Sequence, residues 1–553
     1  MDNQSQRGRV KMEWCRATTA INSSWHSTYY LFLLIFLLTA GLCTSTPGDY
    51  DVEMSQLPLN FDYHNYTMMT GFLKEVARKY PKLISLDSIG KSHQKRELWT
   101  LMVSSHQDDS TLPLGTPNIK FIGNIHGNEA VGRELILHMI EYLVTNYEVN
   151  STVTQLLDTT RIYFLPSMNP DGFEISIGLT CSGGKGRKNM KNIDLNRNFP
   201  DYFIENKSPI QPETEAVIRW MKRVPFILSA SLHGGALVAN YPFENHPEDV
   251  PTGTFTPSLT PDDDVFKHLA TVYARAHPKM HQRGQCESFL SSNPTFEDGI
   301  TNGASWYSIT GGMQDYNYVW HGCMEITLEI SCCKYPSHNE LNKLWNENRE
   351  ALLLYAQEAH KGVKGVVRDA RFGGPIEGAR LKIMGRDMGF NSSSKGEFWR
   401  LLLPRRESYR IEVEADGYER QVIPFQVSTS QGGVTWLEIS MKRRQQFGEP
   451  QSRTNTIQET KETIHIEDSH TTDATQPFNE EKTSQMHKDP MNKSLLLNKT
   501  HFIPSELDDK NLTDVQITRT QKSIQHAMVS AGCKHLVMTP VGLSAILFLV
   551  NVF

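Results

Sequence analysis

The hydrophobic pattern of the sequence changes near residue 360, and this change limits which folds the chain can contain. Residues 56–360 alternate apolar runs with amphipathic segments, which predicts an α/β domain around a largely parallel or mixed sheet. Residues 361–443 hold only short strand-like runs separated by turn residues, which predicts a small all-β sandwich. With 553 residues, the chain has room for two or three domains of about 150 residues each.

Periodicity also assigns individual segments of the first region. The runs that predict strands are residues 98–104, 119–125, 161–165, 226–232 and 324–330. Helical apolar spacing predicts helices at residues 67–79, 130–144, 212–221 and 340–360. Reactive groups of such sheets gather in loops at the carboxyl ends of strands. His126 and His233 end two predicted strands and are therefore candidate site residues.

Both ends of the chain predict export to the cell surface. A basic segment, the apolar run 29–42 and small residues predict a signal peptide over residues 1–45. That run is shorter than the roughly 20 residues of a membrane span, which argues against a signal anchor. The apolar tail after small residues predicts a GPI-anchor signal over residues 528–553, with a tail-anchored helix as the alternative. Its polar spacer is shorter than the usual 8–12 residues or so, which leaves the attachment residue open.

The remaining composition agrees with an extracellular, membrane-tethered protein on the outer face of the plasma membrane. Residues 444–527 are too polar to bury a core and predict a disordered, glycosylated stalk. A net charge of −6 gives no basic surface for nucleic acid, so that class of partner is excluded. Sequons of the N-x-[ST] type begin at Asn65, Asn150, Asn206, Asn391, Asn492, Asn498 and Asn511.

A histidine and a glutamate three residues apart suggest a metal site. His126 and Glu129 lie where a predicted strand leads into a predicted helix, although this pattern alone is weak, because a carboxylate is also favoured in the first turn of a helix. His233, at the end of another predicted strand, strengthens the case. Two histidines and one glutamate leave an open position for water, as in catalytic zinc sites, for which carboxypeptidase A is a standard example.

A water activated by zinc needs a general base, and one predicted strand offers two. Glu325 and Glu329 are four residues apart and therefore share a face of the strand 324–330. Spacing alone does not choose between them. Arg197, beside Asn196 in a polar loop, is suited to bidentate capture of a carboxylate, and Arg187 is a second candidate.

Eight motifs in order resemble the regulatory subfamily of zinc metallocarboxypeptidases. They are HGNE, NPDGFE, DLNRNFPD, SLHGGALVANYPFE, TPDDDVF, NGASWY, GGMQDYNY and EITLEISCCKYP. The resemblance covers roughly residues 56–443 and implies a carboxypeptidase catalytic domain at 56–360. It also implies that the all-β sandwich at 361–443 is transthyretin-like.

The resemblance implies roles for individual residues. One Zn²⁺ per chain would be held by His126, Glu129 and His233, with Glu329 as the general base and acid and Glu325 structural. Asn196 and Arg197 would bind the terminal carboxylate of the substrate, and Arg187 would stabilise the oxyanion. Tyr307 matches the tyrosine that closes over the substrate, although Tyr316 and Tyr318 remain alternatives. The implied disulfides are Cys181–Cys333 and Cys286–Cys332, with Cys323 a buried thiol.

Specificity for peptides and proteins ending in Arg or Lys is implied with two departures from the basic-specific relatives. Glu244 stands where those relatives have Asp, and it keeps the negative charge one methylene further out. Gly322 stands where they have Gln, which predicts a larger and wetter pocket. Both changes affect the expected ratio of Arg to Lys cleavage.

Three functions compete at this stage. The first is an active exopeptidase, and the second is a non-catalytic peptide-binding or adhesion protein on the same fold. The third, an amidohydrolase of another α/β class, is disfavoured because no G-x-S-x-G motif occurs. The complete set of predicted ligands, base and carboxylate-binding residues favours the exopeptidase.

Overall fold

The computed structural model describes residues 58–176, 181, 183–251, 253–282, 286, 296–429 and 434–444. The predicted signal peptide, the anchor signal and all but the first residue of the predicted stalk lie outside these residues. Within the described part, no helix has the length and apolar character needed to cross a bilayer.

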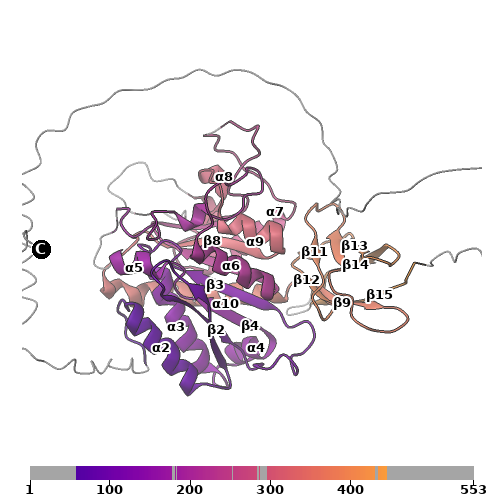
Figure 1. The fold of residues 1–553 in the computed structure, drawn as a ribbon, viewed down its shortest axis with the longest axis horizontal. Helices are drawn as coiled ribbons and strands as arrows, with labels where there is room; N and C mark the ends of the chain where they lie inside the picture. Colours follow the sequence, from indigo (N-terminus) through magenta and orange to yellow (C-terminus); the bar gives the residue numbers. More distant parts are fainter. Residues whose placement is uncertain are drawn as a thin grey trace, which may run out of the picture. The chain divides into compact units, whose positions relative to one another are not determined.

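An eight-stranded mixed sheet forms the centre of the first domain (Figure 1). Its strand order is β1-β2-β4-β3-β5-β8-β6-β7. The four central strands β4, β3, β5 and β8 run parallel, so their carboxyl ends meet at one edge. The strands are β1 (Ile84–Lys91), β2 (Glu97–Val103), β3 (Asn118–Gly123), β4 (Arg161–Leu165), β5 (Phe226–His233), β6 (Ala236–Tyr241), β7 (Ile300–Asn302) and β8 (Met324–Ser331).

Helices cover both faces of this sheet, which confirms the predicted α/β fold. One apolar cluster joins the sheet to α2, α3, α4, α7 and α10, and a second joins it to α6 and α9. The helices are α2 (Tyr66–Lys79), α3 (Val131–Asn146), α4 (Ser151–Thr159), α5 (Pro170–Ser176), α6 (Pro212–Arg223), α7 (Asp263–Ala276), α8 (Gly303–Trp306), α9 (Met313–His321) and α10 (Leu341–Gln357). The short helix α5 begins at a proline, as helices often do.

The strand β8 shows how alternating residues place apolar side chains on one face of the sheet and polar side chains on the other. Every residue of MEITLEIS is buried, and apolar and polar side chains alternate with a period of two. Met324, Ile326, Leu328 and Ile330 belong to the apolar cluster with α3, α7 and α10. The alternate positions therefore direct Glu325, Thr327 and Glu329 to the opposite face.

The second domain is an all-β sandwich, as expected. One sheet has the order β11-β10-β13-β14 and the other β12-β9-β15, in which β9 and β15 are parallel. Apolar side chains from both sheets form a separate core. The strands are β9 (Val363–Asp369), β10 (Arg380–Ile383), β11 (Phe390–Asn391), β12 (Glu397–Arg400), β13 (Tyr409–Glu414), β14 (Gln421–Phe425) and β15 (Thr435–Met441).

A buried aspartate links the sandwich to the first domain. Asp262, at the start of α7, is fully buried and accepts a hydrogen bond from Tyr318 Oη of α9 at 2.6 Å. From the sandwich, Arg386 Nη1 lies 2.8 Å from its Oδ1, and Arg400 pairs with its Oδ2. Arg400 is only 2% exposed, so this carboxylate neutralises a cation that has left water.

We expect Asp262→Ala to destabilise the protein by about 3–5 kcal/mol, because it leaves buried Arg400 without its anion. Thermal unfolding of the purified protein measures the loss. Asp264→Ala is the control, since Asp264 also pairs with Arg386 but is half exposed, and it should cost about 1 kcal/mol or less. Equal effects of the two substitutions would contradict this account of the contact.

Candidate active site

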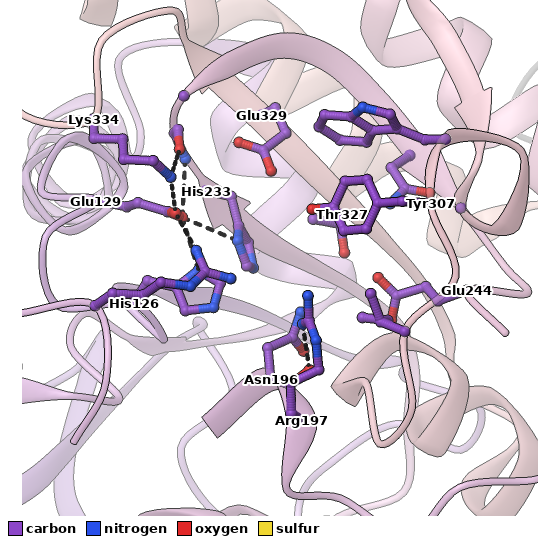
Figure 2. Close-up of a pocket in the computed structure, with 17 residues that line it drawn as sticks. His126, Glu129, Asn196, Arg197, His233, Glu244, Tyr307, Thr327, Glu329 and Lys334 are labelled. Carbon is purple, nitrogen blue, oxygen red and sulfur yellow. Dashed lines mark hydrogen bonds and ion pairs between the residues drawn. The ribbon is translucent and has the colours of Figure 1, made fainter. Parts of the chain in front are cut away.

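All nine residues predicted for metal binding, catalysis and substrate binding line one cavity, to which the parallel strands β5 and β8 contribute (Figure 2). They come from segments far apart in the sequence, and the sheet topology brings them together. The nine are His126, Glu129, Arg187, Asn196, Arg197, His233, Glu244, Tyr307 and Glu329.

His126, Glu129 and His233 form a compact, buried donor set. Their potential ligand atoms all lie within 4.8 Å of one another. Glu129 Oε2 is 3.1 Å from Nδ1 of His126 and 3.1 Å from Nδ1 of His233. Two imidazole nitrogens and one carboxylate oxygen suit Zn²⁺ and leave a fourth position open, so the residues fit a catalytic zinc ion.

Outer contacts fix the orientation of both imidazole rings. Nε2 of His126 lies 3.0 Å from Asp194 Oδ1, and Nε2 of His233 lies 3.1 Å from Ser231 Oγ. With Nε2 held by an oxygen, each ring presents Nδ1 to the metal position. The sequence had left open which ring nitrogen faces the metal.

The two oxygens of Glu129 face different partners. Oε2 faces the imidazoles, whereas Oε1 lies 2.6 Å from Lys334 Nζ and 3.2 Å from Arg187 Nη1. Burial by itself would raise the pKa of Glu129, but His126 and His233 lower it well below its ordinary value. This carboxylate is therefore ionised and ready to bind a cation.

The short 3-10 helix Leu195–Arg197 presents the predicted carboxylate-binding pair. Asp194 caps it by accepting a hydrogen bond from Asn196 N at 3.0 Å. Asn196 Oδ1 accepts from Met313 N at 2.9 Å, which leaves its Nδ2, unpaired among the described residues, for a ligand. Arg197 donates to the carbonyl of Asn196 at 2.8 Å, so one side of its guanidinium is fixed.

The structure places Glu329 and Glu325 in different surroundings. Glu329 lines the cavity, and its buried Oε2 has no partner among the described residues. Burial and the nearby Glu129 raise the pKa of Glu329 to about 7. Glu325 instead contacts Lys120 Nζ at 2.8 Å, with both side chains fully buried, and lies outside the cavity.

Glu244 reaches into the cavity opposite Arg197 and near Tyr307 (Figure 2). Two glycines make room for it: a Cβ at Gly312 would come within 2.0 Å of Glu244 Oε2, and one at Gly303 within 2.9 Å of its Cγ. Its backbone N–H donates to both oxygens of Asp315. Burial raises the pKa of Glu244 to about 8, although Arg197 opposes the shift.

Of the three candidate tyrosines, Tyr307 alone lines the cavity. It lies at the end of α8 and is 43% exposed, which suits a side chain at the rim. Tyr316 and Tyr318 are buried elsewhere. The hydroxyl of Tyr316 contacts His321, and that of Tyr318 donates to Asp262.

The expectation for Gly322 is wrong. This residue caps the C-terminus of α9 with φ +64°, a left-handed conformation that glycine adopts freely. A Cβ there would lie 3.3 Å from Phe390 Cβ and 3.7 Å from Arg400 Nη1, both in the sandwich. Because Gly322 faces the second domain, it does not enlarge the cavity.

Sequence reasoning missed Asp194, Lys334, Gln314 and Asp315. Asp194 stood in a quoted motif, and its position two residues before Asn196 was an available signal for a capping residue. Lys334 follows the paired Cys332 and Cys333, so only the folded loop brings it to Glu129. Gln314 is buried with both amide atoms unpaired among the described residues, which the sequence could not reveal.

The cysteines pair as expected. Disulfides join Cys181 to Cys333 and Cys286 to Cys332. Cys323 is free and buried, and burial raises the pKa of its thiol to about 12. The two bridges tie Cys181 and Cys286 to adjacent residues of the segment that follows β8.

Comparison with known families agrees with the site. Residues 69–351, just over half of the chain, match the family model described as zinc carboxypeptidase. Residues 362–442 match a carboxypeptidase regulatory-like domain. The chain therefore belongs to the zinc carboxypeptidase family, and its cofactor is Zn²⁺.

Three relatives illustrate the similarity. Mouse carboxypeptidase M is 48% identical over 364 residues, which are 65% of this chain and 80% of that protein. The catalytic chain of rat carboxypeptidase N is 40% identical over 412 residues, covering 70% of this chain and 87% of that one. Mouse carboxypeptidase D is 44% identical over 380 residues, 69% of this chain but only 27% of that longer protein.

We expect Asp194→Asn to weaken zinc affinity by about 10–100-fold, because His126 loses the carboxylate that orients its ring. Competition with a chelator, followed by metal analysis, measures the affinity. His233→Ala, which removes a ligand, should abolish stable zinc binding. Wild-type affinity in Asp194→Asn would show that the contact does not orient the ligand.

Proposed function

We propose that this zinc carboxypeptidase is exported and removes C-terminal Arg or Lys from peptides and proteins. The observation that carries the proposal is the buried carboxylate of Glu244, which lies near Arg197 in the cavity that also holds the zinc ligands. A cationic side chain is the partner that such a carboxylate favours.

Substrate binding follows from these two charges. The free carboxylate of a peptide binds the guanidinium of Arg197, a planar group with two parallel donors, and Asn196 Nδ2 adds a third. The last side chain then extends toward Glu244. The backbone of Glu244 is held by Asp315, which fixes this side of the cavity.

Hydrolysis then uses the other side of the cavity. His126, Glu129 and His233 would hold the Zn²⁺, which would supply Lewis-acid activation of water. Glu329 accepts a proton from the attacking water at its unpaired Oε2 and returns it to the leaving amine. Arg187, held by Asp194 at 3.0 Å, stabilises negative charge that develops on the scissile carbonyl.

We expect Glu329→Gln to lower kcat by about 10²–10⁴-fold while zinc and substrate binding remain, because only proton transfer is lost. Single-turnover kinetics and zinc analysis measure both properties. Glu325→Gln is the matched control on the same strand face. It should lower the melting temperature, since Lys120 loses its buried anion, and leave more of the activity. The opposite pattern would reverse the two assignments.

Substrate preference tests the role of Glu244. In a series of peptides that differ only in the last residue, kcat/KM should be at least about tenfold higher for Arg and Lys than for Leu, Phe or Glu. Glu244→Gln should reduce this preference and keep its zinc. C-terminal amidation should abolish turnover, because Arg197 loses its anion. A faster reaction with Leu or Phe than with Arg would refute the basic specificity and leave the peptidase assignment intact.

We expect the preference for Arg in the same peptide series to depend on pH. Because the pKa of Glu244 is raised to about 8, this group holds a proton below that pH in the free enzyme. Binding a cation requires the carboxylate and so releases the proton, and the Arg-to-Leu ratio of kcat/KM should rise from about pH 6 to pH 8. In Glu244→Gln the ratio should not change with pH.

Cell-surface attachment by a lipid anchor completes the proposal. Its support is the apolar segment at each end of the sequence and the two disulfides, which suit an oxidising compartment. We expect a phosphatidylinositol-specific phospholipase to release the protein from intact cells, because the enzyme cuts the anchor. Activity in the medium before and after treatment measures the release. Retention on the membrane would indicate an uncleaved helix.

A further inference from the structure

Asn206 is tied to the loop that presents Arg197. This residue lies between the 3-10 helix Leu195–Arg197 and α6. Its Nδ2 donates to the carbonyl of Arg197 at 3.0 Å and to that of Phe199 at 2.8 Å. Its Oδ1 accepts from Ser208 N at 3.1 Å. One amide group therefore holds both ends of the turn that follows Arg197.

Little space remains around the amide nitrogen of Asn206. A Cβ built on Gly311, whose φ is +76°, would come within 2.3 Å of Asn206 Nδ2. The backbone of Gly311 also pairs with this turn, because Phe199 N donates to Gly311 O at 3.0 Å. Glycine at 311 lets the second loop approach Asn206 this closely.

The sequence also makes Asn206 Nδ2 a candidate site of N-glycosylation. Asn206, Lys207 and Ser208 form an N-x-S sequon, in which a glycan would be joined to Nδ2. A glycosylated amide keeps one hydrogen, yet Asn206 uses two, one for each carbonyl. The sugar would also need the space that Gly311 occupies.

Other sequons among the described residues differ in this respect. Asn65 and Asn150 use Oδ1 to cap helices α2 and α4, and their Nδ2 atoms donate to no described residue. Asn391, in β11, is exposed and its side chain is likewise unbonded. These three can carry a glycan without loss of a hydrogen bond.

We propose that Asn206 is a positioning residue for Arg197 and carries no glycan in the folded enzyme, despite its sequon. The positioning role rests on the proposed function, in which Arg197 binds the substrate carboxylate. Because that contact is made in the ground state and the transition state alike, loss of Asn206 affects KM more than kcat.

The first test measures glycan occupancy on the full chain expressed in a glycosylating eukaryotic cell. Enzymatic deglycosylation in ¹⁸O water converts each occupied Asn to labelled Asp, which peptide mass spectrometry detects. We expect label at Asn65, Asn150 or Asn391 and none at Asn206. Label at Asn206 in catalytically active protein would overturn the proposal.

The second test compares two substitutions that both destroy the sequon. Asn206→Asp keeps the shape but removes both donors, and we expect KM for an Arg-terminated peptide to rise by about tenfold with little change in kcat. Ser208→Ala keeps both amide bonds, because Asn206 uses only the backbone N–H of Ser208. It removes one of two acceptors of Asn198 Nδ2, which keeps its bond to Pro209 O at 3.0 Å, so Ser208→Ala should keep the wild-type KM and, apart from the substitution itself, the wild-type mass.

The possible outcomes distinguish a failure of the proposed function from a failure of the positioning role of Asn206. Wild-type KM in Arg197→Ala would refute the proposed function itself. A raised KM in Arg197→Ala with wild-type KM in Asn206→Asp would refute only the positioning role. A loss of mass in Ser208→Ala would show that Asn206 is glycosylated and refute the inference. If Asn206→Asp does not accumulate, the occupancy measurement on the wild-type chain decides.

Discussion

The polar face of β8 is the constraint on which the catalytic domain depends. This strand is buried on both sides, yet every second residue is polar, so each carboxylate needs a partner or a reactive role. Lys120 from β3 and Ser229 from β5 reach Glu325, and Asn317 from α9 joins them. Because Lys120 and Glu325 are fully buried, breaking this pair would leave an uncompensated charge inside the sheet. With the charge of Glu325 paired through Oε2, the same face of the strand presents Glu329 to the cavity at the next position after Thr327 on that face.

Some residues of the candidate metal site are positioned by strands of the sheet, and others are positioned by loops. His233 and Glu329 lie opposite each other in the parallel register of β5 and β8, so the sheet fixes the distance between one candidate ligand and the predicted base. His126, Glu129 and Arg187 come from loops and depend on side-chain contacts for their positions. Asp194 supplies two of these contacts, to His126 Nε2 and to Arg187 Nε. Burial would raise the pKa of Asp194, but its neighbours, His126 first, lower it well below its ordinary value, so this link between His126 and Arg187 stays charged.

The sequence predicted most of the fold because apolar residues recur with different periods in its strands and in its helices. The strand Arg161–Leu165 was found with its exact ends, and the metal-binding trio was recognisable because each member ends or follows a strand. The strand Ala236–Tyr241 was missed, since it follows β5 after two glycines and reads as its continuation. The helix Asp263–Ala276 was also missed, although its apolar face has helical spacing. Lys334 and the contacts of Asp194 depend on how loops fold back, and Gly322 was misplaced because the end of α9 turns it toward the sandwich, so no spacing rule could locate them.

Hydrogen bonds between two loops make the substrate-binding wall rigid before any ligand arrives. Asn196 Oδ1 accepts from Met313 N, and Asp201 accepts from Gly311 N, so the loop that carries Arg197 is joined to the segment 307–313. Asp201 also accepts from Asn245, next to Glu244, and Asp315 holds the backbone of Glu244 from α9. Arg197 and Glu244 therefore belong to one connected network, which limits the side-chain freedom that a ligand between them would remove. Tyr307, 43% exposed at the rim, is tied to α8 by its backbone N–H, and no described residue bonds its hydroxyl. Among the described residues, hydrogen bonds thus brace the loops that carry Arg197 and Glu244, whereas the hydroxyl of Tyr307 at the rim is free of them.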